Sequence, residues 1–229
     1  QSLLSRVVYE DEGLLVVNKP SGIAVHGGSG VAYGLIEALR AATGKKYLEL
    51  IHRIDRDTSG LVMISKKRST LKLLQDLLRE HKIQKTYAAI VKGQVSLDQQ
   101  LIDAPLFRYE LANGERRVRV SKEGKPSKTE WNVVERFKAA TLVHASPLSG
   151  RTHQIRVHTA HAGHPIACDD KYGEATFDGK MRGLGLQRLF LHASRLTFRH
   201  PVEQKDMTME APLDPHLQAL LNKLDSDKS

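Results

Sequence analysis

One short stretch gathers the residues best suited to chemistry: His52-Arg53-Ile54-Asp55-Arg56-Asp57-Thr58-Ser59-Gly60. Apolar residues at 47–51 and 61–64 flank it, which predicts a loop held between two strands. Catalytic groups are often mounted on such loops, and a carboxylate there can attack a substrate or take a proton from it. Asp55 is the candidate for that role. The alternative that stays open is a basic surface turn in which Asp55 or Asp57 only binds the backbone.

Two further stretches place polar groups on regular elements. Gly150-Arg151-Thr152-His153-Gln154-Ile155-Arg156 predicts a helix that begins near Thr152 and ends at Gly163, with Pro165 beyond it. Residues 85–93 predict a strand that carries Tyr87. From the residues alone, packing of that tyrosine in the core is the simpler explanation.

Four histidines near the second stretch allow a metal site as an alternative. They are His153, His158, His161 and His164. Two of them, three residues apart, could share one helical face. Their spacing matches no familiar metal motif, so surface and capping roles are favoured. We therefore expect no metal and no cofactor.

The rest of the chain must position these groups. Turn signals and apolar spacing predict strands at 6–10, 14–18, 131–137, 141–146 and 207–211. They also predict a helix at 35–42 that Gly44 ends, a helix with Ser69 as its N-cap, and a last helix that Asp214-Pro215 caps. Trp131 is expected in the core. Residues 225–229 are expected to be frayed.

The charge of the chain points to a polyanionic partner. The 229 residues include 35 Lys and Arg against 26 Asp and Glu, a formal charge of +9 with an isoelectric point near 9.6. Nucleic acid is the first candidate and an anionic membrane surface the second. No apolar run approaches the ~20 residues of a membrane span. The single cysteine excludes an internal disulfide.

The excess of cations is concentrated in two segments. Residues 66–92 hold eight cations and two anions, including Lys82 and Lys85. Residues 106–128, with Arg116 and Arg117, predict an exposed and mobile basic hairpin around Asn113-Gly114. We expect both segments to face phosphate groups.

Taken together, the motifs resemble the stand-alone pseudouridine synthases that modify ribosomal RNA, most closely the large-subunit subfamily. Residues 52–60 resemble the family's His-Arg-Leu-Asp loop, with Ile54 in place of leucine. The other matching segments are Lys19-Pro20-Ser21-Gly22, Lys85–Gly93, Gly150–Arg156, Gly163–Ile166 and Leu189–Pro201. Cys168-Asp169 stand where the family often has Gly-Asp.

The resemblance implies a role for each matching residue. Asp55 maps to the catalytic aspartate, Tyr87 to the tyrosine that stacks on the target base, and Arg156 to the arginine that pairs with the aspartate. An arginine beside a carboxylate keeps it ionised. Arg53 would fill the gap left by the flipped base or clamp the backbone. The other residues expected to contact RNA are Lys19, His52, Arg151, Lys82, Lys85, Arg116 and Arg117.

The resemblance also implies a mixed α/β (α+β) fold, with a central, mostly antiparallel sheet, flanking helices and an active-site cleft. It implies one catalytic domain over residues 1–224, and an S4-type RNA-binding domain is expected to be absent from this chain. The activity implied is isomerisation of specific uridines in large-subunit ribosomal RNA by a cytoplasmic monomer without a protein partner. Two alternatives stay open: a non-catalytic RNA-binding or ribosome-assembly module, and a metal-dependent nuclease that uses the histidines.

Overall fold

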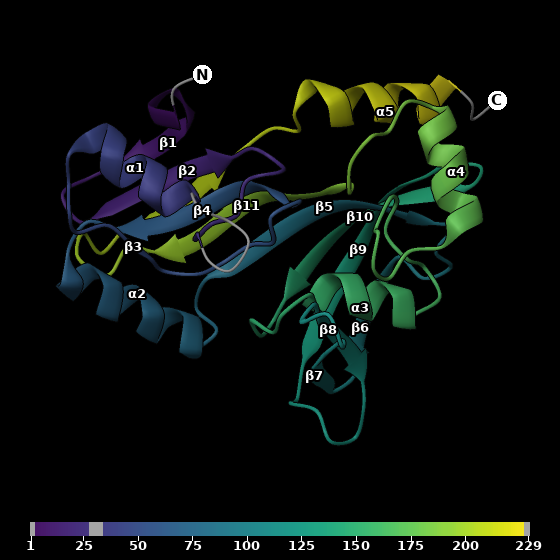
Figure 1. The fold of residues 1–229 in the computed structure, drawn as a ribbon, viewed down its shortest axis with the longest axis horizontal. Helices are drawn as coiled ribbons and strands as arrows, with labels where there is room; N and C mark the ends of the chain where they lie inside the picture. Colours follow the sequence, from purple (N-terminus) through teal and green to yellow (C-terminus); the bar gives the residue numbers. More distant parts are fainter. Residues whose placement is uncertain (1–2, 28–33, 227–229) are drawn as a thin grey trace. The chain divides into compact units, whose positions relative to one another are not determined.

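The computed structural model describes residues 3–27 and 34–226, and Figure 1 shows its elements coloured along the chain. They form two compact units, Gln1–Lys85 with His192–Pro212 and Thr86–Leu191 with Leu213–Ser229, called here the first and second unit. Both units combine helices with mostly antiparallel strands, which confirms the predicted mixed α/β class. No helix in the described ranges is long and apolar enough to cross a membrane.

The first unit is built around strand β4 (Ser59–Ser65), all of whose residues are buried. β4 pairs antiparallel with β2 (Leu14–Lys19) and β3 (Glu49–Leu50), and parallel with β11 (Leu191–Arg199). β1 (Val7–Glu10) extends the sheet beyond β2, and β12 (Asp206–Glu210) pairs with β11. The helices of this unit are η1 (Leu3–Arg6), α1 (Leu35–Thr43) and α2 (Arg68–Arg79).

The predicted helices of the first unit are present, with small changes at two termini. α1 ends at Thr43, one residue after the predicted end, and Gly44 terminates it: this glycine adopts the left-handed conformation at φ +70° and its N–H donates to the carbonyl of Arg40. α2 begins at Arg68 with Lys67 as its N-cap, so the prediction that Ser69 caps it is wrong. Leu74 of α2 packs with Leu61 and Met63 of β4 in the core of this unit.

The second unit is an antiparallel sheet with helices. β10 (Ala140–Pro147) pairs with β5 (Gln84–Lys92) and β9 (Lys128–Arg136), and β6 (Gln99–Asp103) pairs with β9. β7 (Leu106–Glu110) and β8 (Arg116–Val120) form the predicted basic hairpin. The helices are α3 (Gln154–His161), α4 (Ala175–Gly183) and α5 (Pro215–Ser226).

Several expectations for the second unit can be checked directly. Trp131 is fully buried, as predicted. Asp214 caps α5 by accepting the N–H of Leu217 at 2.8 Å, which agrees with the predicted start of this helix. α5 continues through Ser226, so only residues 227–229 of the tail expected to be frayed lie outside the described part of the chain.

Candidate active site

The Asp55 loop, residues 51–58, connects β3 to β4 in the first unit. Ile54 and Thr58 are buried and hold the loop against the unit, while Asp55 is half-buried and Arg53 is exposed. The N–H of Thr58 donates to the carbonyl of Asp55 at 3.1 Å, which forms the predicted turn. The loop therefore presents the Asp55 carboxylate from a fixed backbone, with a cation two residues before it.

Lys19 supports this loop from the interior of the first unit. Its predicted contact with RNA is wrong, because the side chain is not exposed. Its side chain is fully buried at the end of β2. The ammonium donates to the carbonyls of Pro20 at 2.9 Å, Ile23 at 2.7 Å and Arg56 at 2.9 Å. A buried ammonium needs such acceptors, and Lys19 therefore fastens the turn that follows β2 to the Asp55 loop.

Two more hydrogen bonds connect the same two segments. The N–H of Gly22 donates to the carbonyl of Arg56 at 2.9 Å, and the hydroxyl of Ser21 donates to the carbonyl of Asp57 at 2.8 Å. The Lys-Pro-Ser-Gly turn and the Asp55 loop are thus joined by several hydrogen bonds, although Ser21 and Asp57 are 36 positions apart in the sequence.

The strand that leaves the loop is fixed by a glycine and a histidine. Gly60 has φ +113°, and a Cβ added to it would lie 2.2 Å from the carbonyl oxygen of Ala193 in β11. Only glycine allows this approach. Next to it, the hydroxyl of Ser59 and Nδ1 of buried His192 are 2.7 Å apart, and Nε2 of His192 lies 2.8 Å from the carbonyl of Ala211. The sequence marks this segment only as one that matches the family, and it predicts no role for His192.

His52 lies at the start of the Asp55 loop but carries no positive charge near neutral pH. Burial of the ring, aided by the positive charge of Lys85, lowers the pKa of His52 to about 3. Its Nε2 accepts the N–H of Met63 at 2.9 Å. Burial also lowers the pKa of Lys85. The contact of His52 with RNA stays a prediction.

Tyr87 lies on β5, where it pairs with Ala145 of β10 and is mostly buried. This agrees with the predicted strand. Its position in the interior is also what core packing would give, so its stacking role stays a prediction. Asp55 belongs to the first unit and Tyr87 to the second, and the meeting of the two also stays a prediction.

Arg156 is held by a buried carboxylate that sequence reasoning did not single out. Its Nε and Nη2 donate to the two carboxylate oxygens of Asp169 at 2.9 and 2.6 Å. Asp169 also accepts the N–H groups of Lys171 and Tyr172 at 3.0 and 3.1 Å. Burial alone would raise the pKa of Asp169, but these donors hold the pKa below its usual value. The predicted pairing of Arg156 with Asp55 stays a prediction.

Cys168, the residue before Asp169, adopts the backbone conformation that the glycine of the family's Gly-Asp pattern would adopt. Cys168 stands where the family often has glycine, and it adopts φ +59°, the left-handed conformation that glycine prefers. The backbone therefore takes a glycine-like path at a cost on the order of 1–3 kcal/mol. The Cys168 N–H donates to Asp178 at 2.8 Å, which helps to hold that path. The change to cysteine keeps Asp169 in place opposite Arg156.

Three of the four histidines of the α3 region form hydrogen bonds within the protein. His153 Nδ1 lies 2.6 Å from the hydroxyl of Tyr172, and His164 Nδ1 lies 2.7 Å from the carbonyl of Lys92. His158 is buried between the hydroxyl of Thr129 at 2.7 Å and the carbonyl of Ala104 at 2.9 Å. α3 itself starts at Gln154, two residues after the predicted start, because His153 takes φ +53° as its N-cap.

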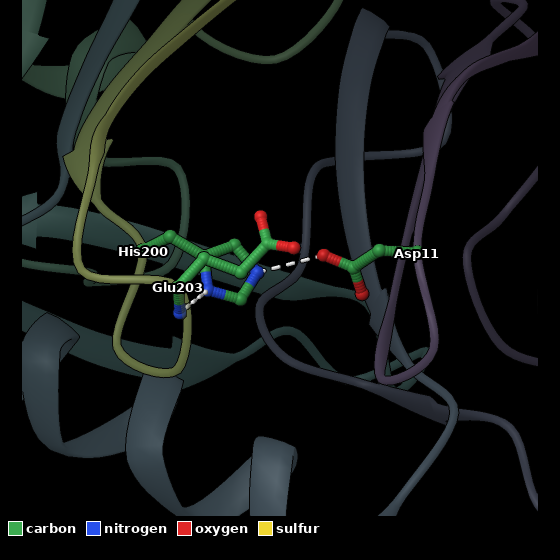
Figure 2. A group of neighbouring side chains, drawn as sticks. All are labelled: Asp11, His200 and Glu203. Carbon is green, nitrogen blue, oxygen red and sulfur yellow. Dashed lines mark hydrogen bonds and ion pairs between the residues drawn. The ribbon is translucent and has the colours of Figure 1, made fainter.

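One other cluster has the residue types of a metal site, and it lies in the first unit. Figure 2 shows Asp11, His200 and Glu203, whose ligand atoms lie within 4.8 Å of one another. Nδ1 of His200 accepts the N–H groups of Val202 and Glu203 at 3.2 and 3.1 Å. Nε2 must then carry the proton that it donates to Asp11 at 2.7 Å. Both ring nitrogens are therefore used within the protein, which favours a structural link between two turns over a cation site.

The cations expected to contact RNA have different surroundings. Arg116 is exposed on β8, and exposed Lys82 lies 3.1 Å from Glu80. Arg117 is half-buried and paired with Glu115 at 3.0 Å. Exposed Arg151 donates from Nε and Nη2 to the carbonyl of Pro126 at 3.3 and 3.2 Å. Their contacts with RNA stay predictions; Arg117 and Lys82 each already have a carboxylate partner.

Comparison with known proteins identifies relatives over nearly the whole chain. Ribosomal large subunit pseudouridine synthase C of Haemophilus ducreyi is 55% identical over 227 residues, which cover 99% of this chain and 71% of that protein. The protein of the same name from Escherichia coli K12 is 54% identical, with coverage of 97% and 71%.

Solved structures and a family pattern agree with these relatives. The structure of human RNA pseudouridylate synthase domain containing 4 superposes with a TM-score of 0.81 at 25% identity, covering 97% of this chain and 94% of that one. Human RNA pseudouridylate synthase domain containing 1 gives a TM-score of 0.77 at 25% identity, covering 93% and 86%. Residues 13–161 match the RNA pseudouridylate synthase family. The chain belongs to this family of RNA-modifying enzymes.

Proposed function

We propose that this enzyme isomerises specific uridines to pseudouridine in large-subunit ribosomal RNA. The observation that carries the proposal is 55% identity, over 99% of the chain, to a protein named for that activity. The formal charge of +9 suits a polyanionic substrate. We propose further that it acts as a single chain, since every group that the chemistry needs can come from this one polypeptide. A ribosomal RNA substrate favours action in the cytoplasm.

The proposed reaction needs one ionised carboxylate near the sugar, and Asp55 supplies it. The N1–C1′ bond of uridine breaks, the base turns, and C5 forms a bond to C1′; C5 then loses a proton and N1 gains one. Asp55 either attacks covalently or takes the C2′ proton. Its half-buried place on a loop fastened by Lys19 supports this role, because a catalytic group must be held in position.

The other three residues of the proposed site bind the flipped base and orient the reacting groups. A uridine stacked in RNA must be flipped out before it can react. Tyr87 offers an aromatic face for that base, and exposed Arg53 fills the space or clamps the backbone. Arg156 is proposed to stabilise the ionised form of Asp55, with Asp169 holding the guanidinium by two hydrogen bonds.

The test is the conversion of RNA that carries tritium at C5 of uridine, with product analysis of the nucleosides. The wild-type enzyme should release tritium and form pseudouridine, whereas Asp55→Asn should form none while binding RNA within a few-fold of wild type. Asp57→Asn is the matched control, because it makes the same chemical change two residues away, and it should keep most of the activity. Cleaved RNA, or intact unmodified RNA with the wild-type enzyme, would refute the proposed function.

A further inference from the structure

A second candidate binding site lies in the second unit, at the base of the basic hairpin. A cleft of about 450 Å³ is bounded by β7, β8, the turn at 123–125 and the loop at 150–152 before α3. That volume falls within the range of roughly 300–1,000 Å³ that holds small ligands. Its walls include the apolar side chains of Leu106, Phe107 and Val118.

The cleft carries an excess of positive charge that the protein does not neutralise. Arg108, Lys125 and Arg151 line it, against one anion, Glu123. Within the described ranges, the side chains of Arg108 and Lys125 have no hydrogen bond or ion pair. By contrast, Arg117 and Lys171 nearby share the carboxylate of Glu115. The cations at the base of the hairpin are therefore available to an external anion.

The backbone around the cleft is fixed before any ligand arrives. Leu106 and Lys125 exchange two hydrogen bonds, of 2.9 and 2.8 Å. A Cβ added to Gly124 would lie 2.4 Å from the carbonyl carbon of Leu106, so the turn packs directly on β7. Arg151 is held by the carbonyl of Pro126. Because the backbone and Arg151 are already ordered, only the side chains of Arg108 and Lys125 would lose conformational freedom when an anion binds.

The chemistry of the lining identifies the class of ligand. Guanidinium and ammonium groups bind phosphate oxygens, and apolar and aromatic walls suit a ribose or base. Phe107 has the guanidinium of Arg119 over its ring at 5.1 Å, which adds another cation at the edge of this surface. A single nucleotide of an RNA strand has both parts.

We propose that this cleft binds a nucleotide of the RNA substrate other than the target uridine, with its phosphate between Arg108, Lys125 and Arg151. The inference rests on the proposed function only in that the polyanion is RNA. It assigns the main phosphate contact of the hairpin to its base and not to Arg117. It also assigns Arg151 a role in substrate binding, because this side chain lines the cleft.

The test is binding of ribosomal RNA fragments across a range of salt concentrations. Each lost phosphate contact should lower the magnitude of the log–log slope by about 0.7. The double variant Arg108→Gln, Lys125→Gln removes two of the three cations around the one proposed phosphate, so it should lower the magnitude by about 0.7, with weaker binding at every salt concentration. Both side chains are exposed, and an unchanged melting temperature will show that the fold is intact.

The matched control is Lys138→Gln, Lys180→Gln. These lysines are exposed on the same unit, line a different hollow, and give the same change in net charge. An equal loss of slope in both double variants would overturn the proposal, because it would reflect total charge and not the cleft. An unchanged slope in Arg108→Gln, Lys125→Gln would overturn it as well.

Phosphate ethylation gives an independent arm. Wild-type binding should be blocked by ethylation at particular phosphates, and at least one of these positions should lose its effect in Arg108→Gln, Lys125→Gln. Identical interference patterns for the two proteins would refute a phosphate contact in the cleft. Neither arm needs turnover, so a failure of the proposed isomerase activity would appear separately, as absence of pseudouridine with the wild-type enzyme.

Discussion

Removal of the carboxylate that holds Arg156 should destabilise the second unit strongly. In Asp169→Asn the shape is kept and the charge is lost. The Arg156 and Asp169 side chains are 5% and 0% exposed, so the guanidinium cannot turn to water for a new partner. The amide group of asparagine must also face a donor in either orientation, because all the contacts of Asp169 are N–H groups.

The size of the effect follows from the burial of the pair. Breaking a buried ion pair by removing one partner costs about 3–5 kcal/mol. For a chain of this length, 1 kcal/mol corresponds to roughly 2–4 °C in melting temperature. Asp169→Asn should therefore melt about 6–20 °C below the wild type in calorimetry.

The neighbouring residue offers a matched control for this experiment. Asp170 also lies near Arg156, at 3.4 Å, but its side chain is 65% exposed. An exposed pair contributes about 0–1 kcal/mol, so Asp170→Asn should melt close to the wild type. Equal melting temperatures for the Asp169 and Asp170 variants would refute the reasoning, because burial is the feature that separates the two carboxylates.

The same pair sets a pH dependence of stability. The folded-state pKa of Asp169 lies below its ordinary value of 3.8. A carboxyl group with a lowered pKa adds stability that is fully present above the ordinary value and is lost as the pH falls through the folded-state pKa. The difference in unfolding free energy between the wild type and Asp169→Asn should therefore be constant near neutral pH and shrink only below 3.8.

Two further predictions concern the proposed site. Lys19→Met keeps the length of the side chain but leaves buried carbonyls without their donor, at about 1–3 kcal/mol for each unsatisfied group. It should lower both the melting temperature and the single-turnover rate; turnover at the wild-type rate would show that the Asp55 loop does not depend on this ammonium. Tyr87→Ala should lose about 1–3 kcal/mol of RNA binding or base flipping that Tyr87→Phe retains, measured by titration and single-turnover kinetics. Equal losses in the two Tyr87 variants would exclude a stacking role.

Local signals in the sequence predicted many of the elements because their causes are local, but they did not predict β6, β11 or α4. Gly44 ends α1 through a left-handed conformation, and Asp214 caps α5 through a hydrogen bond three residues along the chain. The strands that carry Tyr87 and Trp131 follow from runs of β-forming residues. The start of α2 was misplaced because Ser69 is a common capping residue, but the chain enters the helix two residues earlier with Lys67 as the N-cap.

The identity of each residue's partner could not be predicted in the same way. Lys19 looked like a cation in a surface turn, and its burial depends on the carbonyl of Arg56, 37 residues away. His192 had no predicted role, and its partner Ser59 is 133 residues away. No periodicity or turn rule contains such distant neighbours, because they meet only when separate strands pair.

The sequence alone determined the chemistry available to this protein: a carboxylate on a turn, an aromatic residue on a strand, an arginine on a helix, and an excess of positive charge. Those depend on residue type and local spacing. The tertiary structure decided which charges are already neutralised. It paired Arg156 with Asp169 and buried the ammonium of Lys19, but it left Arg108 and Lys125 without partners in the described part of the chain. The physical reason is that the environment of a charge is set by what packs around it, and packing is a property of the folded chain.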